Sequence, residues 1–364
     1  MMAASVSVTE LGFVQECEPW RLRSPQFPSK VGGRPAWLGE VGVPGPERLQ
    51  CGVCMKPLAL LVQVYAPCTG SFHRTVFLFT CRDPTCHRVG ERRGYKVFRN
   101  QLPRKNDTYS YGPPPDSHPQ SEEYFTSFQL KCGLRLCRVC GCLGPKSCSK
   151  CHKVNYCDRV HQLMDWKAQH KVLCGPQFDA HRVEVADHGF LFPEYELLTE
   201  AEELDSDASL DDDSTMSQMD MESSTLNSSS NLESSMDELK LNEDELNAIA
   251  KHESEEDKAF SRFKKRISIE PEQVLRYCKG GEPLWISLQN VPAENDILNC
   301  GCGAKRAFEF QVMPQLLNHL KVDSLQKSID WGVLAVYTCS ANCSAETHYV
   351  EEFLWKQDVP GDTI

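Results

Sequence analysis

Cysteine and histidine residues recur in closely spaced pairs near the middle of this chain, and such pairs bind metal ions in proteins. The pairs are Cys137-x2-Cys140, Cys148-x2-Cys151, Cys157-x3-His161 and His170-x3-Cys174. A C-x2-C pair turns the chain so that both thiolates can face one ion, and we expect the last two pairs to lie on one face of a helix. Four ligands per structural zinc predict two closed sites, with no coordination position left open for catalysis.

A second pattern relates the two ends of the chain. The motif Gly32-Gly33-Arg34-Pro35-Ala36-Trp37-Leu38 near the start matches Gly280-Gly281-Glu282-Pro283-Leu284-Trp285-Ile286 near the end. Each motif precedes a cysteine pair, a strand with Gln63 or Gln311, an apolar strand ending in cysteine, a further cysteine, and a strand ending in Gln101 or Gln357. This shared order predicts two related β-rich units, in which Trp37 and Trp285 are equivalent packing residues.

Each β-rich unit contains four cysteines that could close around one ion. The pairing favours one zinc bound by Cys51, Cys54, Cys81 and Cys86, and another bound by Cys300, Cys302, Cys339 and Cys343. The alternative is that they are ordinary buried cysteines, which are common in strands. No role is assigned to Cys17, Cys68, Cys132, Cys142 or Cys278, although Cys142 is close enough in sequence to the central pairs to be a rival ligand.

The composition excludes some classes of protein. The 364 residues carry 19 cysteines and a formal charge of −12. No apolar run approaches the roughly 20 residues that a membrane helix needs. The first residues lack a basic stretch followed by an apolar one, so we expect no secretion. In a reducing compartment paired cysteines bind metals, and disulfides are rare. We therefore expect an intracellular zinc protein.

The acidity is concentrated in one segment. Residues 200–257 contain 20 Asp or Glu against Lys240 and Lys251, and no aromatic residue lies between Tyr195 and Phe260. Such a segment cannot bury enough apolar area to offset its chain entropy, so most of it is predicted to be a disordered linker. The alternative is an acidic arm that attracts a basic partner. An interrupted helical face that ends near Pro271 is predicted from Leu239, Leu246, Ile249, Phe260, Phe263 and Ile267.

The predicted fold class is α+β, built mostly of small β units stabilised by zinc. The duplicated halves flank the central zinc segment and the acidic linker. The predicted organisation is a β-rich unit at 1–130, the central zinc segment at 131–175, a connector at 176–199, the acidic linker at 200–257 and a second β-rich unit at 258–364. If the β-rich units are duplicates, we expect them to pack together as one pseudo-symmetric domain.

The central segment resembles the MYND zinc finger in its Tyr156-Cys157 step and its terminal His170-x3-Cys174. His161 stands where many members of that family have cysteine. In that family the ligand pairs interleave. The resemblance therefore implies one zinc on Cys137, Cys140, Cys157 and His161 and another on Cys148, Cys151, His170 and Cys174. It also implies a protein-interaction module, with corepressor proteins as possible partners.

Besides the finger, six stretches carry a recognisable pattern: Phe98 to Asp107, Phe192-Pro193-Glu194, Trp285 to Pro292, Cys300 to Leu320, Asp330 to Cys339 and Trp355 to Val359. Through them, almost the whole chain outside the acidic linker resembles the programmed cell death protein 2 family. The resemblance implies a chaperone that binds ribosomal protein two of the small subunit as it is made, and that supports small-subunit assembly. An acidic arm would suit such a basic client. Older views of the family imply a nuclear regulator linked to apoptosis, so we expect a cytoplasmic and nuclear location.

Neither catalysis nor direct DNA binding is expected. The chain lacks a G-x-G-x-x-G motif, a phosphate-binding loop, an H-E-x-x-H motif and a G-x-S-x-G motif. The histidines His73, His118, His188 and His348 are scattered, and none has an evident catalytic partner in sequence. Counting six thiolates and two zinc ions, residues 137–174 carry a charge of only +3. This charge is smaller than that of surfaces that bind along a phosphate backbone, so we expect no direct DNA binding.

Overall fold

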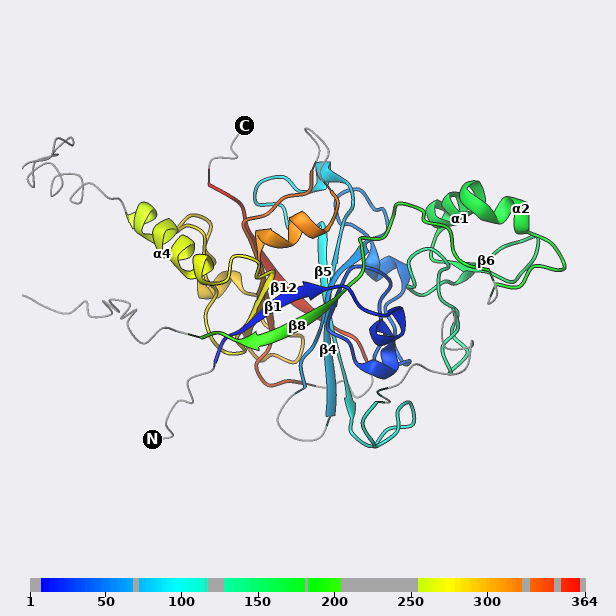
Figure 1. Cartoon of the computed structure of the whole chain (residues 1–364), viewed down its shortest axis with the longest axis horizontal. Coiled ribbons are helices and arrows are strands. Elements are labelled where there is room, and N and C mark those ends of the chain that lie inside the picture. Colours follow the sequence, from blue (N-terminus) through cyan, green and yellow to red (C-terminus); the bar gives the residue numbers. More distant parts are fainter. Residues whose placement is uncertain are drawn as a thin grey trace, which may run out of the picture.

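Ten antiparallel strands form one closed β-barrel at the centre of the molecule (Figure 1). The computed structural model describes residues 8–67, 72–114, 116, 128–180, 183–203, 255–322, 328–343 and 348–360. The barrel strands are β1 (Glu10–Gln15), β2 (Lys30–Val31), β3 (Ala59–Tyr65), β4 (Phe72–Thr80), β5 (Tyr95–Pro103), β8 (Tyr195–Ala201), β9 (Leu275–Tyr277), β10 (Arg306–Val312), β11 (Val333–Cys339) and β12 (Val350–Gln357). The fold is thus β-rich with few helices.

The two β-rich regions share this one sheet. Around the barrel the order is β1-β8-β2-β3-β4-β5-β12-β11-β10-β9, and β9 pairs with β1 to close it. The regions meet where β5 pairs with β12, with Val97 opposite Glu352 and Arg99 opposite Val350. On the other side the barrel is completed by β1 and by β8. Most of β8 lies in the segment predicted as a connector, and its last two residues lie within the predicted linker range.

Corresponding glutamines make the same contact in both regions. Gln63 on β3 accepts a hydrogen bond from the backbone N–H of Ala36 and donates one to its carbonyl, at 3.0 and 3.2 Å. Gln311 on β10 does the same with Leu284, at 2.6 and 2.9 Å. Both strands carry a bulge just before the glutamine, between Leu60 and Val62 and between Phe308 and Phe310. In both regions, therefore, a glutamine side chain on the sheet holds the glycine–proline–tryptophan motif by the same pair of hydrogen bonds.

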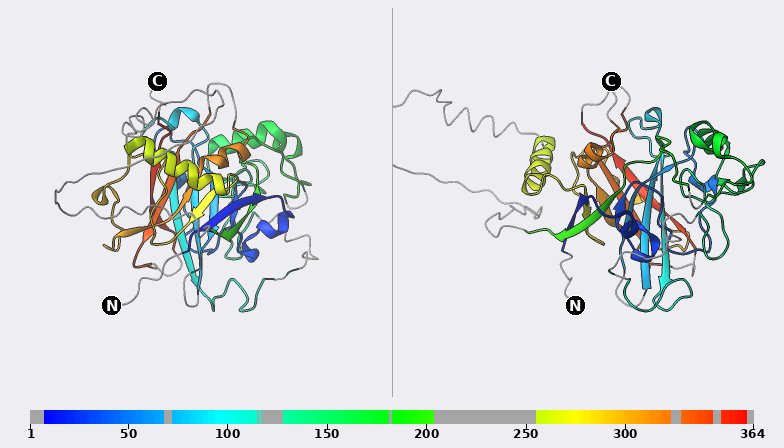
Figure 2. Two further views of the ribbon diagram at one scale, coloured as in Figure 1. Left: turned by 60° about the vertical axis from the view of Figure 1, so that its left-hand side comes forward. Right: turned by 45° about the vertical axis from the view of Figure 1, so that its right-hand side comes forward.

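Strand β11 is buried on both faces, which explains its continuous apolar sequence. Leu334 and Val336 point into the main core, and Val333, Ala335 and Tyr337 belong to a second cluster. The long helix α4 (Glu255–Ile269) covers that second cluster with Phe263 and Ile267 (Figure 2). Phe260, Phe263 and Ile267 of the predicted helical face are thus confirmed on a helix, although Phe260 is exposed, whereas Leu239, Leu246 and Ile249 lie outside the described residues. So does the predicted linker from residue 204 to 254.

The central zinc segment, called the finger below (residues 137–174), is docked on the barrel by the first motif. The indole Nε1 of Trp37 donates to the carbonyl of Gly141 at 2.8 Å, and Arg34 Nη2 donates to the carbonyl of Arg138 at 3.1 Å. A side chain at Gly141 (φ 71°) would place its Cβ 2.8 Å from that of Arg34, so only glycine fits there. Trp285 packs only half-buried in the second cluster, without a finger against it.

Short elements complete the described part. In the finger these are β6 (Lys146–Ser147), β7 (Asn155–Tyr156), α1 (Arg159–Asp165), the π-helical turn Trp166–His170 and α2 (Lys171–Leu173). The 3-10 turns are Pro19–Leu22, Ser24–Gln26, Pro46–Leu49, Pro84–Cys86, Glu294–Asp296 and Pro314–His319. A search of the described residues finds no helix with the length and apolar character needed to span a membrane.

Candidate metal centres

Four groups of possible metal ligands come together in the structure, and their members match the four predicted sets. In each group the ligand atoms all lie within 4.8 Å of one another. The groups are Cys51, Cys54, Cys81 and Cys86; Cys137, Cys140, Cys157 and His161; Cys148, Cys151, His170 and Cys174; and Cys300, Cys302, Cys339 and Cys343. The interleaved pairing implied for the finger is thus the one that the geometry produces.

The N-terminal group lies where β4 ends. Cys81 is the residue after β4, and Cys86 ends a 3-10 turn that Asp83 caps by accepting from the backbone N–H of Thr85 at 3.1 Å. The backbone N–H groups of Val53 and Asp83 each donate to a thiol sulfur at 3.4 Å, that of Cys51 and that of Cys81. Such N–H donors stabilise thiolates, and they arise here because each cysteine opens a tight turn.

The C-terminal group is more open to solvent. Cys339 ends β11 and is buried, but Cys302 is exposed and Cys343 is half-buried. A hydrogen bond from the backbone N–H of Ala304 lowers the pKa of Cys302 to about 7. Arg99 donates to the carbonyl of Cys343 at 3.0 Å and approaches its sulfur at 3.7 Å, so β5 of the N-terminal region supports the C-terminal group.

The finger's two groups use the ends of its helical segment rather than one helix face. Cys157 precedes α1, because Asp158 adopts an extended conformation and caps the helix by accepting from the backbone N–H of His161 at 2.9 Å. His170 closes the π-helical turn, and Cys174 follows α2 in an extended conformation. The predicted helix placement is therefore wrong for Cys157, whereas the backbone N–H of Cys174 donates to the carbonyl of His170 at 2.8 Å across one helical turn. Each pair converges on its group.

The distances within the groups fit tetrahedral zinc. Zn–S bonds of about 2.3 Å in a tetrahedron place two sulfurs about 3.8 Å apart. The sulfurs of Cys54 and Cys81 are 3.6 Å apart, and those of Cys148 and Cys174 are 3.8 Å apart. In the C-terminal group the contacts are 3.5 and 3.6 Å. Disulfide sulfurs would lie about 2.05 Å apart, so these contacts are not disulfides.

Protonation chemistry also favours a cation in the N-terminal group and in the finger group that contains Cys137. Burial, together with a hydrogen bond to Cys140, raises the pKa of the Cys137 thiol, and burial raises that of Cys81. Several thiols in contact cannot all ionise unless a cation compensates their charge, and zinc does so when it displaces the protons. His161 turns Nδ1 toward the sulfur of Cys157 at 3.0 Å, and His170 turns Nε2 toward that of Cys151 at 3.4 Å.

Cys142 lies outside these groups. Its side chain is buried, and its sulfur is 3.9 Å from the carbonyl oxygen of Cys140. The groups found among the described residues do not include it. Treating Cys142 as a spare thiol thus agrees with the geometry. Of the other unassigned cysteines, Cys68 lies outside the described residues.

A buried ionic network is centred on Asp165 in the finger. Asp165 on α1 accepts hydrogen bonds from the hydroxyl of Tyr156 at 2.6 Å and from His188 Nε2 at 2.9 Å, and Arg138 lies 3.6 Å away. Burial alone would raise the pKa of Asp165, but these hydrogen bonds and the charge of Arg138 keep that pKa below its usual range. The network ties α1 to the segment that follows the finger. Sequence reasoning missed it, because His188 carried no visible partner.

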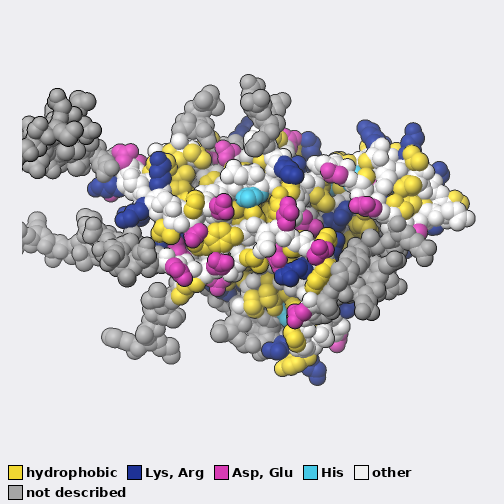
Figure 3. All heavy atoms as spheres, in the orientation of Figure 1, with side chains coloured by type: hydrophobic (Ala, Val, Ile, Leu, Met, Phe, Trp, Pro, Cys, Tyr) yellow, Lys and Arg dark blue, Asp and Glu magenta, His cyan; other side chains and the backbone are white. Residues whose placement is uncertain are grey.

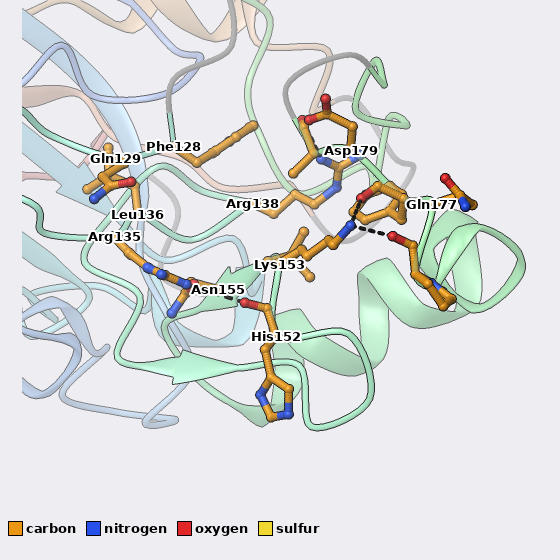
Figure 4. Close-up of a pocket in the computed structure, with 14 residues that line it drawn as sticks. Phe128, Gln129, Arg135, Leu136, Arg138, His152, Lys153, Asn155, Gln177 and Asp179 are labelled. Carbon is orange, nitrogen blue, oxygen red and sulfur yellow. Dashed lines mark hydrogen bonds between the residues drawn. The ribbon is translucent and has the colours of Figure 1, made fainter.

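The finger and the segments just before and after it line a pocket of about 490 Å³ (Figure 4). Phe128, Leu136, Val154 and Phe178 contribute apolar surface, and Arg135, Arg138, Lys153 and Asp179 contribute charge. Lys153 holds the pocket wall by donating to the carbonyls of Pro176 and Phe178 at 2.7 and 2.6 Å. A mixed apolar and basic surface of this kind suits a peptide more than a small metabolite.

Comparison with known protein families covers most of the chain. Residues 8–116 match the model of the N-terminal domain of programmed cell death protein 2, residues 257–358 match the model of its C-terminal putative domain, and residues 137–174 match the MYND finger. The first two matches fall on the two β-rich regions of the barrel, and the third coincides with the finger.

Similar proteins extend over the full length. The chain is 50% identical over 364 residues to programmed cell death protein 2 of Bos taurus and 52% identical over 362 residues to that of Mus musculus, covering 99% of this chain and of each relative. It is 31% identical over 350 residues to programmed cell death protein 2-like of Mus musculus, with 92% of each chain covered. No solved structure matches the chain.

Proposed function

The chain belongs to the programmed cell death protein 2 family, and from this premise we propose that it is a non-enzymatic chaperone and assembly factor. Its client is a newly made, basic protein of the small ribosomal subunit, namely ribosomal protein two. By holding that client it supports assembly of the subunit. The observation that carries the proposal is the extent of the family match, which includes both barrel regions and the finger.

Zinc has a structural role in this proposal. Four ions are bound, one by each group, and every ion has four protein ligands, so no coordination position is left for a substrate. The ions hold the chain ends of β4 and β11 and the finger in place. We further propose that the two barrel regions are duplicates, on the strength of the matching glutamine contacts and bulges. The protein works in the cytoplasm and the nucleus.

Charge supports a basic client. A ribosomal protein outside the ribosome carries many Lys and Arg side chains made to meet RNA, and an acidic surface would bind them and delay RNA contact. Asp and Glu side chains recur across the barrel face that β1 and β8 cross (Figure 3). The acidic segment that follows β8 in sequence adds to this charge.

One experiment compares what the tagged full-length protein retains from gentle lysate, with and without nuclease, by quantitative mass spectrometry. The chaperone proposal predicts one basic small-subunit protein at near-equal stoichiometry, resistant to nuclease and without the rest of the subunit. Cys51→Ser and Cys300→Ser should reduce its recovery as strongly as Cys137→Ser, because the barrel is the binding body. Recovery of intact subunits, or of no ribosomal protein, would contradict the proposal.

The second candidate function is a nuclear regulator that recruits corepressors through the finger. The pocket beside Arg135 and Lys153 favours it, since MYND-type fingers are interaction modules. It predicts that corepressors replace the ribosomal protein in the same purification and that barrel cysteine variants keep most of the activity. Turnover of a substrate by the zinc-loaded protein, lost on changing a non-ligand His or Cys, would contradict both candidates.

A further inference from the structure

Strand β8 has one edge that is only partly paired. One edge of β8 pairs with β1, from Glu196 opposite Gln15 to Ala201 opposite Glu10. Its other edge pairs with β2 only at Tyr195 and Glu196, and one more bond follows, from the N–H of Leu197 to the carbonyl of Ser29 at 2.9 Å. Beyond Leu197 that edge pairs with no described strand.

The backbone register shows which groups this edge presents. The N–H of Glu202 donates to the carbonyl of Thr9 directly opposite, so the even-numbered residues of β8 direct their backbone groups toward β1. The odd-numbered residues direct theirs the other way, as the bond from Leu197 shows. The N–H and C=O groups of Thr199 and Ala201 therefore point out from the open edge. These are the donors and acceptors with which a further strand pairs.

The neighbouring chain explains why the edge stays open. Continuing β2 backward would bring Pro28 and Phe27 alongside β8. Proline has no N–H to donate, and Phe27 has a φ of 49°, which turns the chain out of the extended conformation. β2 is therefore only two residues long, and the edge that it leaves uncovered is built into the local sequence.

The ribbon formed by β1, β8 and their flanks is acidic throughout. Residues 8–18 and 195–203 contain seven glutamates and no lysine or arginine. Glu196 pairs with Arg21, and Glu202 pairs with Arg266 and Arg276. The other five form no ion pair with another described residue; they are Glu10, Glu16, Glu18, Glu200 and Glu203. Positive charge on a partner is the complement of this ribbon.

Side chains on the outer face of β8 alternate in character. Leu197 points into the main core, so Glu196, Leu198 and Glu200 point outward, and Leu198 keeps 39% of its surface exposed. Because β2 already lies beside Glu196, a strand added at the open edge would place its outward side chains beside Leu198 and Glu200. The complementary segment has an apolar residue and a Lys or Arg two positions apart, so that the apolar side chain meets Leu198 and the cation meets Glu200.

From these observations we infer that the open edge of β8 is the docking edge for an extended basic segment of a protein partner. The segment adds as a further strand beside Thr199 and Ala201, its outward cation faces Glu200, and Glu203 adds negative charge just beyond the end of β8. This inference rests on the proposed function for the identity of the partner, because it deepens that function by naming the surface. The strand-adding geometry and the charge do not depend on which protein supplies the segment.

The test uses the zinc-loaded full-length protein and a labelled eight-residue peptide of repeating Lys-Thr-Val-Thr, which places Lys and Val alternately on one face of a strand. Binding is followed by fluorescence anisotropy. Thr199→Pro removes the backbone N–H that points out from the open edge and leaves the hydrogen bonds to β1 intact. Thr199→Val is its matched control. The pair Glu200→Lys with Glu203→Lys reverses charge at the edge. Glu47→Lys with Glu184→Lys makes the same change in net charge at exposed positions outside the ribbon.

We expect Thr199→Pro and the edge charge reversal each to weaken peptide binding at least about tenfold, and both controls to stay within about twofold. A peptide of the same composition with repeating Lys-Val-Thr-Thr, which places Lys and Val on opposite faces of a strand, should bind more weakly. Equal affinity for wild type, Thr199→Pro and the edge reversal would overturn the inference.

Co-purification from lysate separates this inference from the proposed function. If wild type and Thr199→Pro retain the basic ribosomal protein equally, the docking edge is wrong and the chaperone role stands. If wild type retains none, the chaperone role fails, and the peptide measurements alone decide the edge. Recovery by wild type and the Val variant, with loss in the Pro variant, supports both.

Discussion

Arg74 and Glu309 meet inside the barrel and connect its two regions. They belong to β4 and β10, which are not neighbours in the sheet, and both side chains are fully buried. Arg74 Nη2 lies 2.6 Å from Glu309 Oε2, and the hydroxyl of Tyr277 donates to the same carboxylate at 3.2 Å. Burial opposes ionisation of Glu309, but Arg74 holds its pKa below the usual range. The ion pair is thus maintained at neutral pH.

Removing one partner of this pair should destabilise the barrel. Glu309→Gln leaves the Arg74 charge buried without its counterion, so we expect the free energy of unfolding in urea, with saturating zinc, to fall by about 3–5 kcal/mol at pH 7. Because the folded-state pKa of Glu309 is depressed, the wild-type advantage is present above the unfolded pKa and is lost as pH falls through the folded value.

The matched control is Glu351→Gln, at a half-exposed pair with Lys96. That change should cost at most about 1 kcal/mol. Equal effects of the two substitutions, or an advantage of wild type over Glu309→Gln that grows toward acid pH, would contradict the assigned role of the buried pair.

The ligand residues could be grouped from sequence because their spacing is local, whereas this ion pair could not. Cys51 and Cys54, or Cys137 and Cys140, identify themselves by a two-residue gap. Arg74 and Glu309 are 235 positions apart, and nothing near Glu309 marks it as buried. Its counterpart at the bulge of β3, Leu61, is apolar, so even the repeat predicts the wrong residue type.

At the scale of elements, the finger is held against the barrel by a side-chain hydrogen bond. Trp37 provides the contact, and the same position in the second motif, Trp285, carries no finger. Trp37→Phe keeps the ring but removes the hydrogen bond to Gly141, which should cost about 1 kcal/mol at the contact. We expect faster hydrogen exchange across residues 137–174 in that variant and no change there in Trp285→Phe. Equal exchange in both would show that the finger is held by other contacts.

The four metal groups differ in exposure, so they should lose metal in order. Cys302 is exposed in the C-terminal group, whereas Cys137, Cys140, Cys157 and His161 are all buried. On titration with a chelator we expect the C-terminal group to open first. Mass spectrometry of alkylated peptides should then show Cys302 and Cys343 labelled before Cys137 and Cys140. Simultaneous labelling of all groups, or labelling of Cys137 first, would contradict this order.

Elements were predictable where one local rule dominated. The apolar run of β11 and the helical period around Phe263 and Ile267 are both present in the structure. The placement of Cys157 on a helix was wrong, because Asp158 is the N-cap and α1 begins only at the residue after it. Strand β8 was missed because Glu196 to Ala201 is rich in residues that also favour helices, and only its pairing with β1 makes it extended.

At the scale of the whole molecule, closure of the barrel depends on segments outside the repeated motifs. The two β-rich regions meet at β5 and β12, but β1 and β8 fill the remaining gap, and both come from stretches without a motif. Sequence comparison of the two ends therefore identified the units and their ligands, but it did not predict a single barrel. Long-range pairings of this kind are decided by the complete fold.

The distribution of negative charge is likewise visible only in part from the sequence. The acidity of residues 200–257 is plain in the sequence, but Glu10 attracts no notice until β1 brings it beside β8, and Glu16 and Glu18 follow β1 directly in sequence. The acidic surface thus begins on the barrel itself. We expect association with a basic client to weaken as salt screens these charges, because exposed charges interact over only about 8 Å at physiological ionic strength.

Native mass spectrometry of the tagged full-length protein, purified gently from cells, tests the central claim most directly. The account predicts a species whose mass equals one chain, four zinc ions and one basic small-subunit ribosomal protein. Denaturation should then release that protein as a single second component. A chain that carries zinc but no ribosomal protein, or one that carries corepressors or nucleic acid instead, would contradict the account.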